Sequence, residues 1–89
     1  MKKLMMMVRR NLKMSENKTG AQCAHAAIGL YKKDQQEHWK CVVLDGSDKK
    51  FEENKVRHPE AYVVHDAGYT EVPAGSETVM AWWEEDDDK

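Results

Sequence analysis

An unbroken apolar run close to the start of the chain, Leu4 to Val8, restricts the fold more than any other feature. A strand with one solvent-exposed face alternates apolar and polar residues, whereas a strand that is buried on both faces is apolar throughout. Arg9 and Arg10 end the run after five residues. A membrane span needs roughly 20 apolar residues and a secretion signal roughly 7–15. The run therefore predicts a central strand of an α/β sheet, in a protein that stays where it was made.

The segment after this strand predicts a helix over about residues 18–33, because its apolar residues recur at helical spacing. The stripe expected to pack on the sheet consists of Ala21, Ala24, Ile28 and Tyr31. A neighbouring polar stripe consists of Lys18, Gln22, His25 and Lys32. Thr19 and Gln22 have the spacing of a capping box, which would start the helix slightly later.

The remaining elements are three short strands and a charged helix. The strands are predicted at residues 41–44, 61–64 and 78–83, and the helix at about 48–57, with Phe51 and Val56 as its few anchors. Since no helix separates the last two strands, this order predicts an α/β fold. We expect a mixed four-stranded sheet with helices packed on its faces, in one small domain. The domain is expected to span residues 1–83, and residues 84–89 to form a solvated acidic tail.

Charge is divided unevenly along the chain. Residues 1–33 carry eight Lys or Arg against one acidic residue, a net +7, while residues 34–89 carry six against fifteen, a net −9. A basic segment of this kind can hold a polyanion although the whole chain is mildly acidic. The basic first third of the chain is therefore compatible with nucleic-acid binding.

Cys23 and Cys41 have no metal-binding spacing, and each lies in an apolar segment. Both are expected to be buried thiols, which fits a reducing compartment and, without a targeting segment, the cytoplasm. Trp82 and Trp83 alternate on the last predicted strand, so one is expected in the core and the other facing outward.

Three segments combine residue types that carry chemistry. The first opens the predicted helix and contains Lys18, Gln22 and His25. The second, Asp66 to Thr70, follows a predicted strand, and the third, Pro73 to Val79, leads into the last strand. Ligands of open α/β sheets bind beyond the carboxyl ends of strands. Asp66 has that position if the preceding strand forms.

In these segments the chain resembles the type-2 peptidyl-tRNA hydrolase family. Four blocks of the family's pattern recur in order and cover about half of the chain: Val8, Arg9, Leu12 and Met14; Lys18, Ala21, Gln22, Cys23, His25 and Ala26; Asp66, Ala67, Gly68 and Thr70; and Pro73, Gly75, Ser76, Thr78 and Val79. The resemblance implies a mixed four-stranded sheet with helices on both faces. It also implies hydrolysis of the ester between a peptide and the 3′ end of tRNA, without a metal or an organic cofactor, often by a homodimer.

The chain departs from the family's pattern in three places. Asn11 stands where the family usually has Asp, and the middle helix is shorter than usual. Trp82, Trp83 and the acidic tail replace a Gly-Pro segment and a further helix. Without this helix, one flank of the sheet is expected to be exposed. We expect this to affect the stability of the monomer and the usual dimer contact more than the site.

Hydrolysis of an ester needs a nucleophile, a proton acceptor and a group that stabilises the oxyanion. The serines lack the nucleophile-elbow pattern, which favours direct attack by water. Our hypothesis assigns catalytic roles to five residues: Asp66 orients or deprotonates the water, His25 relays a proton, Thr70 and Thr78 position the water, and Lys18 neutralises a phosphate or the oxyanion. The residues expected to bind the substrate, peptidyl-tRNA, are Arg9, Arg10, Lys13 and Gln22.

Each of these residue types also has a more ordinary role. A histidine on a helix, an Asp before Ala-Gly and a lysine at a helix start are usually solvated or structural. His38, His58 and His65 are expected to be so. Two other functions stay open: a silent family member that binds tRNA or a protein without turnover, and a structural dimerisation domain. Hydrolysis of peptidyl-tRNA separates the enzyme from both, and tRNA binding separates the two from each other.

Overall fold

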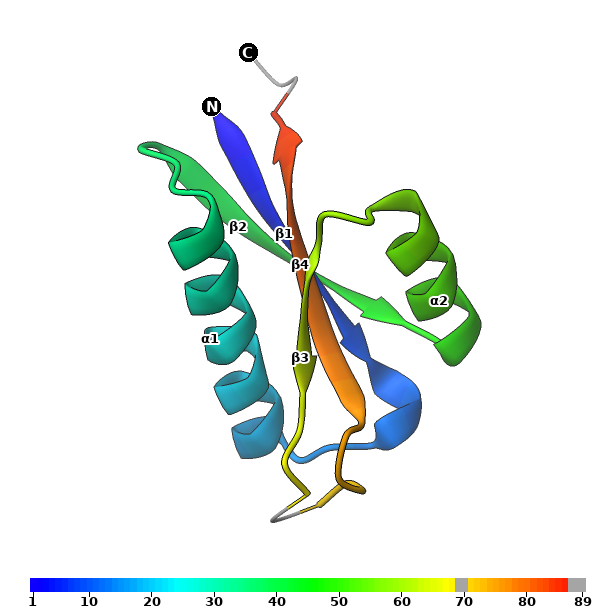
Figure 1. Ribbon diagram of the computed structural model, residues 1–89. Helices are drawn as coiled ribbons and strands as arrows, with labels where there is room; N and C mark the ends of the chain where they lie inside the picture. Colours follow the sequence, from blue (N-terminus) through cyan, green and yellow to red (C-terminus); the bar gives the residue numbers. More distant parts are fainter. Residues whose placement is uncertain (69–70, 87–89) are drawn as a thin grey trace.

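The computed structural model describes residues 1–68 and 71–86 (Figure 1). The described residues form four strands, two α-helices and one short 3₁₀ helix, in the predicted order. The elements are β1 Lys2–Arg9, η1 Arg10–Leu12, α1 Glu16–Lys33, β2 Trp39–Gly46, α2 Asp48–Arg57, β3 Tyr62–His65 and β4 Glu77–Glu85. The α/β class is therefore confirmed.

The sheet is mixed, and its strand order is β2-β1-β4-β3. Strand β1 pairs in parallel with β2 and antiparallel with β4, which in turn pairs antiparallel with β3. Strands β1 and β3 both run antiparallel to β4, and β2 runs parallel to β1. The carboxyl ends of β1, β2 and β3 therefore lie at the same end of the sheet. Loops that follow these strands are where ligands of such sheets collect.

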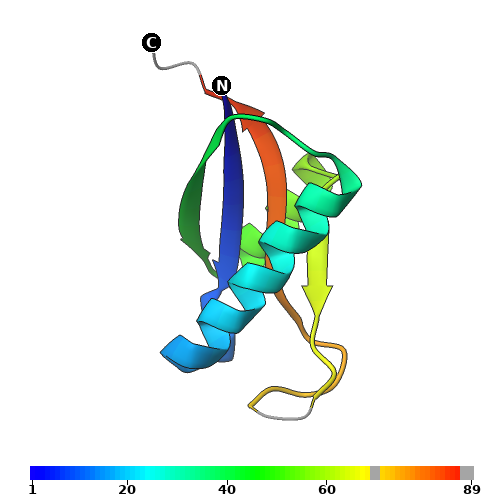
Figure 2. The same ribbon diagram turned by 90° about the vertical axis from the view of Figure 1, so that its left-hand side faces the viewer.

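Strand β1 is buried on both faces, as the apolar run predicts. Leu4, Met6 and Val8 join one core cluster with Ala26 and Leu30 of α1. The alternate residues of β1, Met5 and Met7, join a second cluster with Phe51, Met80 and Trp82. The two helices cover opposite faces of the sheet, with α1 on one side and α2 on the other (Figures 1 and 2).

The packing face predicted for α1 is wrong. Ile28 and Tyr31 are 56% and 39% exposed, whereas the buried residues of α1 are Gln22, Ala26 and Leu30. The apolar stripe was misleading because a polar residue, Gln22, belongs to the buried face. The helix also begins earlier than expected, at Glu16, and Ser15 Oγ caps it by accepting the Lys18 N–H at 3.1 Å.

Two other expectations about burial and one about the end of the last strand need correction. Cys41 is exposed because β2 is an edge strand, and only Cys23 is partly buried. Phe51 anchors α2 as expected, but Val56 is 82% exposed because it lies on the solvent side of that helix. Strand β4 runs through Glu84 to Glu85, so the first two acidic residues of the expected tail belong to the sheet.

The two tryptophans of β4 point to opposite faces, but neither is simply solvated. Trp82 is buried in the cluster beneath α2. Trp83 packs against the cluster beneath α1, and its indole N–H donates to the Asp34 carbonyl at 2.8 Å. Trp39 approaches the Trp83 ring edge-on, with the ring centres 5.7 Å apart. The expectation that one of the pair faces outward is therefore wrong.

Candidate active site

A cavity of about 430 Å³ lies between the first turns of α1 and the end of β3. It is lined by Lys18, Ala21, Gln22, His25, His65, Asp66 and Ala67. This geometry follows from the topology. Strand β3 ends at the same end of the sheet at which α1 begins, so Lys18 and Asp66 become neighbours although they are 48 positions apart in the chain. Lys18, His25 and Asp66, three of the residues expected to be catalytic, thus share one cavity.

The centre of the cavity is an ion pair between Lys18 Nζ and Asp66 Oδ1, 2.5 Å apart. Both side chains are nearly buried, with 12% and 6% of their surfaces exposed. The second carboxylate oxygen of Asp66 accepts the Gly68 N–H at 2.7 Å. The Lys18 ammonium, followed by the Gly68 amide, lowers the pKa of Asp66 below its usual value. Asp66 is therefore held as a carboxylate, a form better suited to orienting a water molecule than to accepting its proton.

Gln22 and Thr78 form a buried extension of this pair. Gln22 Nε2 lies 3.4 Å from Asp66 Oδ1, and Gln22 Oε1 accepts the Thr78 hydroxyl at 2.6 Å. Gln22 and Thr78 are 4% and 0% exposed. Gln22 was expected to bind substrate and Thr78 to position a water molecule. Both side chains are buried, and Gln22, which also lines the cavity, connects Thr78 to the Asp66 carboxylate.

A register shift in the sheet aims Thr78 at α1. The β3–β4 pairing moves from Val63↔Met80 to His65↔Glu77, which leaves one extra residue on β4 between these pairs. An extra residue of this kind is a β-bulge, which re-aims side chains locally. Val79 packs in the cluster beneath α1, and the neighbouring Thr78 reaches Gln22 of the same helix. Two consecutive side chains therefore face α1, which regular alternation does not allow.

The backbone around Asp66 is tied to the loop that leads into β4. The Asp66 N–H donates to the Ser76 carbonyl at 2.9 Å, and the Gly75 N–H donates to the Asp66 carbonyl at 2.6 Å. Gly68 and Gly75 have φ of 83° and 84°, a region that glycine adopts without steric cost. The loop that carries the carboxylate is thus held at both ends.

A second link joins this loop to the start of α1. Ser15 donates its N–H and its hydroxyl to the two carboxylate oxygens of Glu71, at 2.7 and 2.6 Å. These two bonds lower the pKa of Glu71. Since Ser15 also caps α1, the link fixes the helix turn that carries Lys18 against the segment beyond Asp66.

The two histidines that border the cavity differ in their surroundings. His25 is exposed and lies within electrostatic reach of Asp66, whose pKa it helps to lower. His65 is 59% exposed, and its Nε2 lies 3.9 Å from Glu77. Glu77 in turn contacts Lys55 of α2, which links His65 to that helix. Both histidines therefore border the cavity, His25 from α1 and His65 from the end of β3.

The basic residues expected to bind substrate do not line the cavity. Arg9 pairs with Asp48 at 2.8 Å and lies over the Phe51 ring, and Arg10 pairs with Asp45. Lys13 is exposed, with a left-handed backbone (φ 54°) at the end of η1. Thr70, the remaining residue expected to be catalytic, lies outside the described residues.

Sequence reasoning missed the contributions of Gly68 and of the Ser15–Glu71 link. The pattern Asp-x-Gly is a signal for a side chain that accepts the backbone N–H two residues later, and it was available from the sequence. The Ser15–Glu71 link had no such signal, because the two residues are 56 positions apart. Among residues 1–68 and 71–86, no group of three or more His, Cys, Asp or Glu residues is arranged to hold a metal ion.

Thr78 provides a direct test of the buried network. Replacing Thr78 by Val removes the hydroxyl and leaves Gln22 Oε1 buried without a donor, which typically costs about 1–3 kcal/mol. Thr78→Ser keeps the hydroxyl and should lose less. The free energy of unfolding from urea titration measures both variants. Equal stability of the Val and Ser variants would show that the hydrogen bond contributes nothing.

Comparisons with known proteins agree on one family. A family model described as peptidyl-tRNA hydrolase PTH2 matches residues 2–87. The chain is 32% identical over 100 residues to the peptidyl-tRNA hydrolase of Methanothermobacter thermautotrophicus, with 98% of this chain and 89% of that protein covered. It is also 32% identical to the mitochondrial peptidyl-tRNA hydrolase 2 of Bos taurus and to the probable peptidyl-tRNA hydrolase 2 of Dictyostelium discoideum. It covers 52% and 45% of these two relatives, or about half of their length.

Proposed function

This chain belongs to the peptidyl-tRNA hydrolase PTH2 family, and from that premise we propose that it hydrolyses the ester that joins a peptide to the 3′ end of tRNA. The observation that carries the proposal is the nearly buried Lys18–Asp66 pair in the cavity. A carboxylate and an ammonium held together at low exposure combine a group that orients water with a group that stabilises an oxyanion. Both residues belong to the segments that resemble the family.

In the proposed mechanism a water molecule attacks the ester carbonyl. Asp66 accepts a hydrogen bond from this water and orients it, while His25 takes the proton that the water loses. An N–H of Lys18 stabilises the oxyanion of the tetrahedral intermediate. When the ester C–O bond breaks, His25 returns the proton to the ribose oxygen. The products are tRNA with a free 3′-terminal ribose hydroxyl and the carboxylic acid of the peptide, which releases its remaining proton to solvent.

The two threonines have different proposed roles. Thr78 acts through Gln22 and keeps the Asp66 carboxylate in position. Thr70, four residues beyond Asp66, is proposed to position the water through its hydroxyl. Gln22 is proposed to support Asp66 from the cavity wall, where it can also contact the end of the bound substrate.

Release of an N-acetylated amino acid from aminoacyl-tRNA tests this function. The purified chain is mixed with N-acetyl-aminoacyl-tRNA labelled in the amino acid, and the acid-soluble label is followed with time. We expect multiple turnovers per chain, and aminoacyl-tRNA with a free amino group serves as the control for non-peptidyl substrate. Binding of the tRNA without release of the label would contradict the proposed hydrolysis and would support the alternative, a family member that binds tRNA without turnover.

We propose that the tRNA is held mainly through its phosphates by the basic first third of the chain, and that Lys13 is one of the contacts. The logarithm of the association constant should then fall linearly with the logarithm of the salt concentration. Lys13→Ala should weaken binding at low salt and reduce the slope by about one unit. Lys49→Ala, an exposed lysine of α2 in the acidic part of the chain, is the matched control. A slope near zero for the unsubstituted chain would contradict phosphate binding.

We also propose a homodimer in which a second copy covers the exposed apolar residues beside β2. Ile28, Tyr31 and Trp39 border a hollow of about 320 Å³ between α1 and the segment before β2, and Val43 of the edge strand is 50% exposed. Patches of this kind on a soluble domain commonly mark interfaces. Light scattering of purified protein should give twice the mass of one chain, and Ile28→Glu should give the mass of one chain. A single-chain mass before substitution would exclude this dimer.

The proposed compartment is the cytoplasm. Two free cysteines, one exposed, suit a reducing environment, although the mammalian relatives are named as mitochondrial proteins. Among the helices within residues 1–68 and 71–86, none is long and apolar enough to cross a membrane. Recovery of the native protein in an organelle or extracellular fraction would contradict this assignment.

A further inference from the structure

Cys23 and Cys41 lie on the same side of the sheet, beside the core cluster beneath α1. In the β1–β2 ladder Cys41 is the partner of Leu4. Side chains of paired residues in a ladder point to the same face of a sheet. Leu4 belongs to the cluster beneath α1, so Cys41 also points to the α1 side. Cys23 of α1 packs against this cluster as well.

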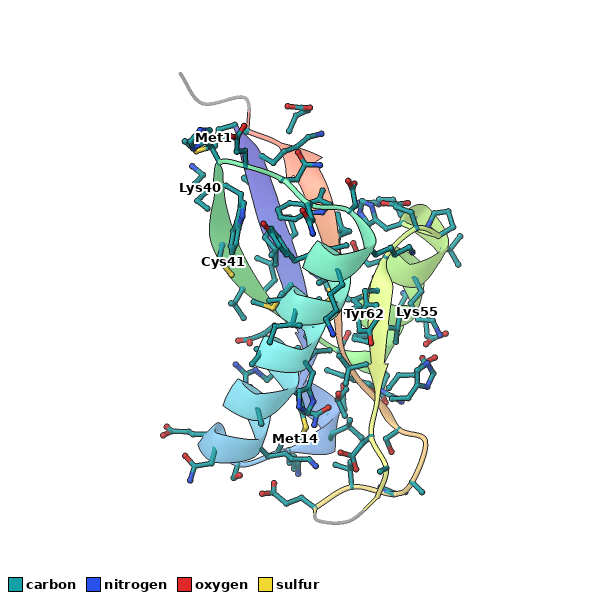
Figure 3. The ribbon with its side chains drawn as sticks, turned by 60° about the vertical axis from the view of Figure 1, so that its left-hand side comes forward. Met1, Met14, Lys40, Cys41, Lys55 and Tyr62 are labelled. Carbon is teal, nitrogen blue, oxygen red and sulfur yellow. The ribbon has the colours of Figure 1, made fainter. Side chains whose placement is uncertain are left out.

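The two thiols are close enough to influence each other. Partial burial raises the pKa of Cys23, and the neighbouring Cys41 raises it further, while Arg10 opposes both effects. Partial burial also raises the pKa of Cys41. Cys41 is exposed at the sheet edge, where a reagent can reach it, and Figure 3 labels it on β2. Neither thiol has a part in the proposed hydrolysis.

From this arrangement we infer that Cys23 and Cys41 form a reversible disulfide that lowers turnover at the neighbouring site. The oxidant is a small-molecule disulfide such as oxidised glutathione. The Cys41 thiolate attacks one sulfur of the oxidant, forms a mixed disulfide and releases one glutathione thiolate. The Cys23 thiolate then attacks the Cys41 sulfur and releases the second glutathione. Two protein thiols lose two electrons and two protons in total, and one oxidised glutathione becomes two reduced glutathione molecules.

The bond would disturb the site because of what else α1 carries. A disulfide requires its two Cα atoms within about 7 Å of each other. In the reduced protein α1 packs on β1, β3 and β4, and the cysteine of β2 is exposed beside it. The inference requires that closing the bond moves the middle of α1 relative to the edge strand β2. Gln22 precedes Cys23 directly, and Lys18 and His25 lie on the same helix, so the groups around Asp66 shift with it.

The experiment treats the reduced full chain with oxidised glutathione and follows intact mass, disulfide-linked peptides and hydrolysis of N-acetyl-aminoacyl-tRNA. We expect a mass loss of two hydrogen atoms and a peptide that joins α1 to β2. Turnover should fall on the order of 10- to 100-fold, since a displacement of about 1 Å at a site has effects of this size. Dithiothreitol should restore it. Cys41→Ser, at an exposed position outside the site, should keep the parent's turnover and lose the response to oxidised glutathione.

Three results would overturn the inference. They are a chain that retains glutathione on Cys41 without the internal bond, a disulfide between two chains, and an internally bonded chain with the turnover of the reduced protein. The turnover readout rests on the proposed function, whereas the mass readout does not. A reduced chain without hydrolysis would therefore refute the proposed function and the regulatory effect, and the linked peptide would still decide whether the bond forms.

Discussion

Replacing Asp66 by Asn is expected to lower turnover on the order of 100- to 10,000-fold, the range typical of groups that handle the attacking water or its proton. The amide keeps the shape of the side chain and one oxygen for the Gly68 N–H. It loses the negative charge that Lys18 faces and that orients the water. Affinity for tRNA should stay the same or rise, because a carboxylate repels phosphates.

The measurement separates turnover from binding. Initial rates at saturating N-acetyl-aminoacyl-tRNA give kcat, and binding of the uncleaved substrate analogue gives Kd. Asp45→Asn, the same chemical change at an exposed aspartate that pairs with Arg10, is the matched control and should retain the parent's kcat. Turnover of Asp66→Asn at the parent's rate would remove Asp66 from the mechanism.

The pH dependence of hydrolysis should agree with this role. Lys18, and then the Gly68 amide, hold the pKa of Asp66 in the folded protein below its value in the unfolded chain. Ionised Asp66 therefore contributes stability above its ordinary pKa, and this contribution is lost as the pH falls through the lowered one. We expect that the titration of Asp66 has no effect on hydrolysis near neutrality and reduces it only in acid. Loss of activity above the ordinary range of a carboxylate would point to another group.

Phe51→Ala is expected to destabilise the protein by about 3–5 kcal/mol, the usual cost of removing a buried phenyl ring. Among the residues of α2, all of which are described, Phe51 alone is buried. Its ring packs with Met5, Met7 and Trp82, and the Arg9 guanidinium lies over it at 5.9 Å. Domains of this size are stable by only about 5–15 kcal/mol, so the variant should lose much of its folded population.

Val56→Ala in the same helix is the control. Val56 is 82% exposed, and its truncation should change stability by no more than about 0.5 kcal/mol. Denaturant titrations followed by circular dichroism measure both variants. Similar losses for the two substitutions would mean that α2 is not held to the sheet through Phe51.

The α/β architecture, and the expectation that Lys18, His25 and Asp66 share one cavity, could be predicted from the amino-acid sequence. The apolar run Leu4–Val8 required cover on two faces, and the structure places α1 and α2 on those faces. The segments around Lys18 and Asp66 were recognisable because each combines a local turn or helix-start signal with residues that carry chemistry. Periodicity and turn patterns are local properties, and for that reason they can be read from neighbouring residues.

The buried side of α1 and the contacts of its polar residues could not be predicted in this way, because they depend on segments far apart in the chain. Hydrophobicity assigned Ile28 to the core and Gln22 to solvent, yet Gln22 is buried because Thr78, 56 residues away, satisfies its amide oxygen. The strand order leaves β2 at an edge and exposes Cys41. Contacts between distant segments balance the cost of burying a polar group, and no local pattern contains that information.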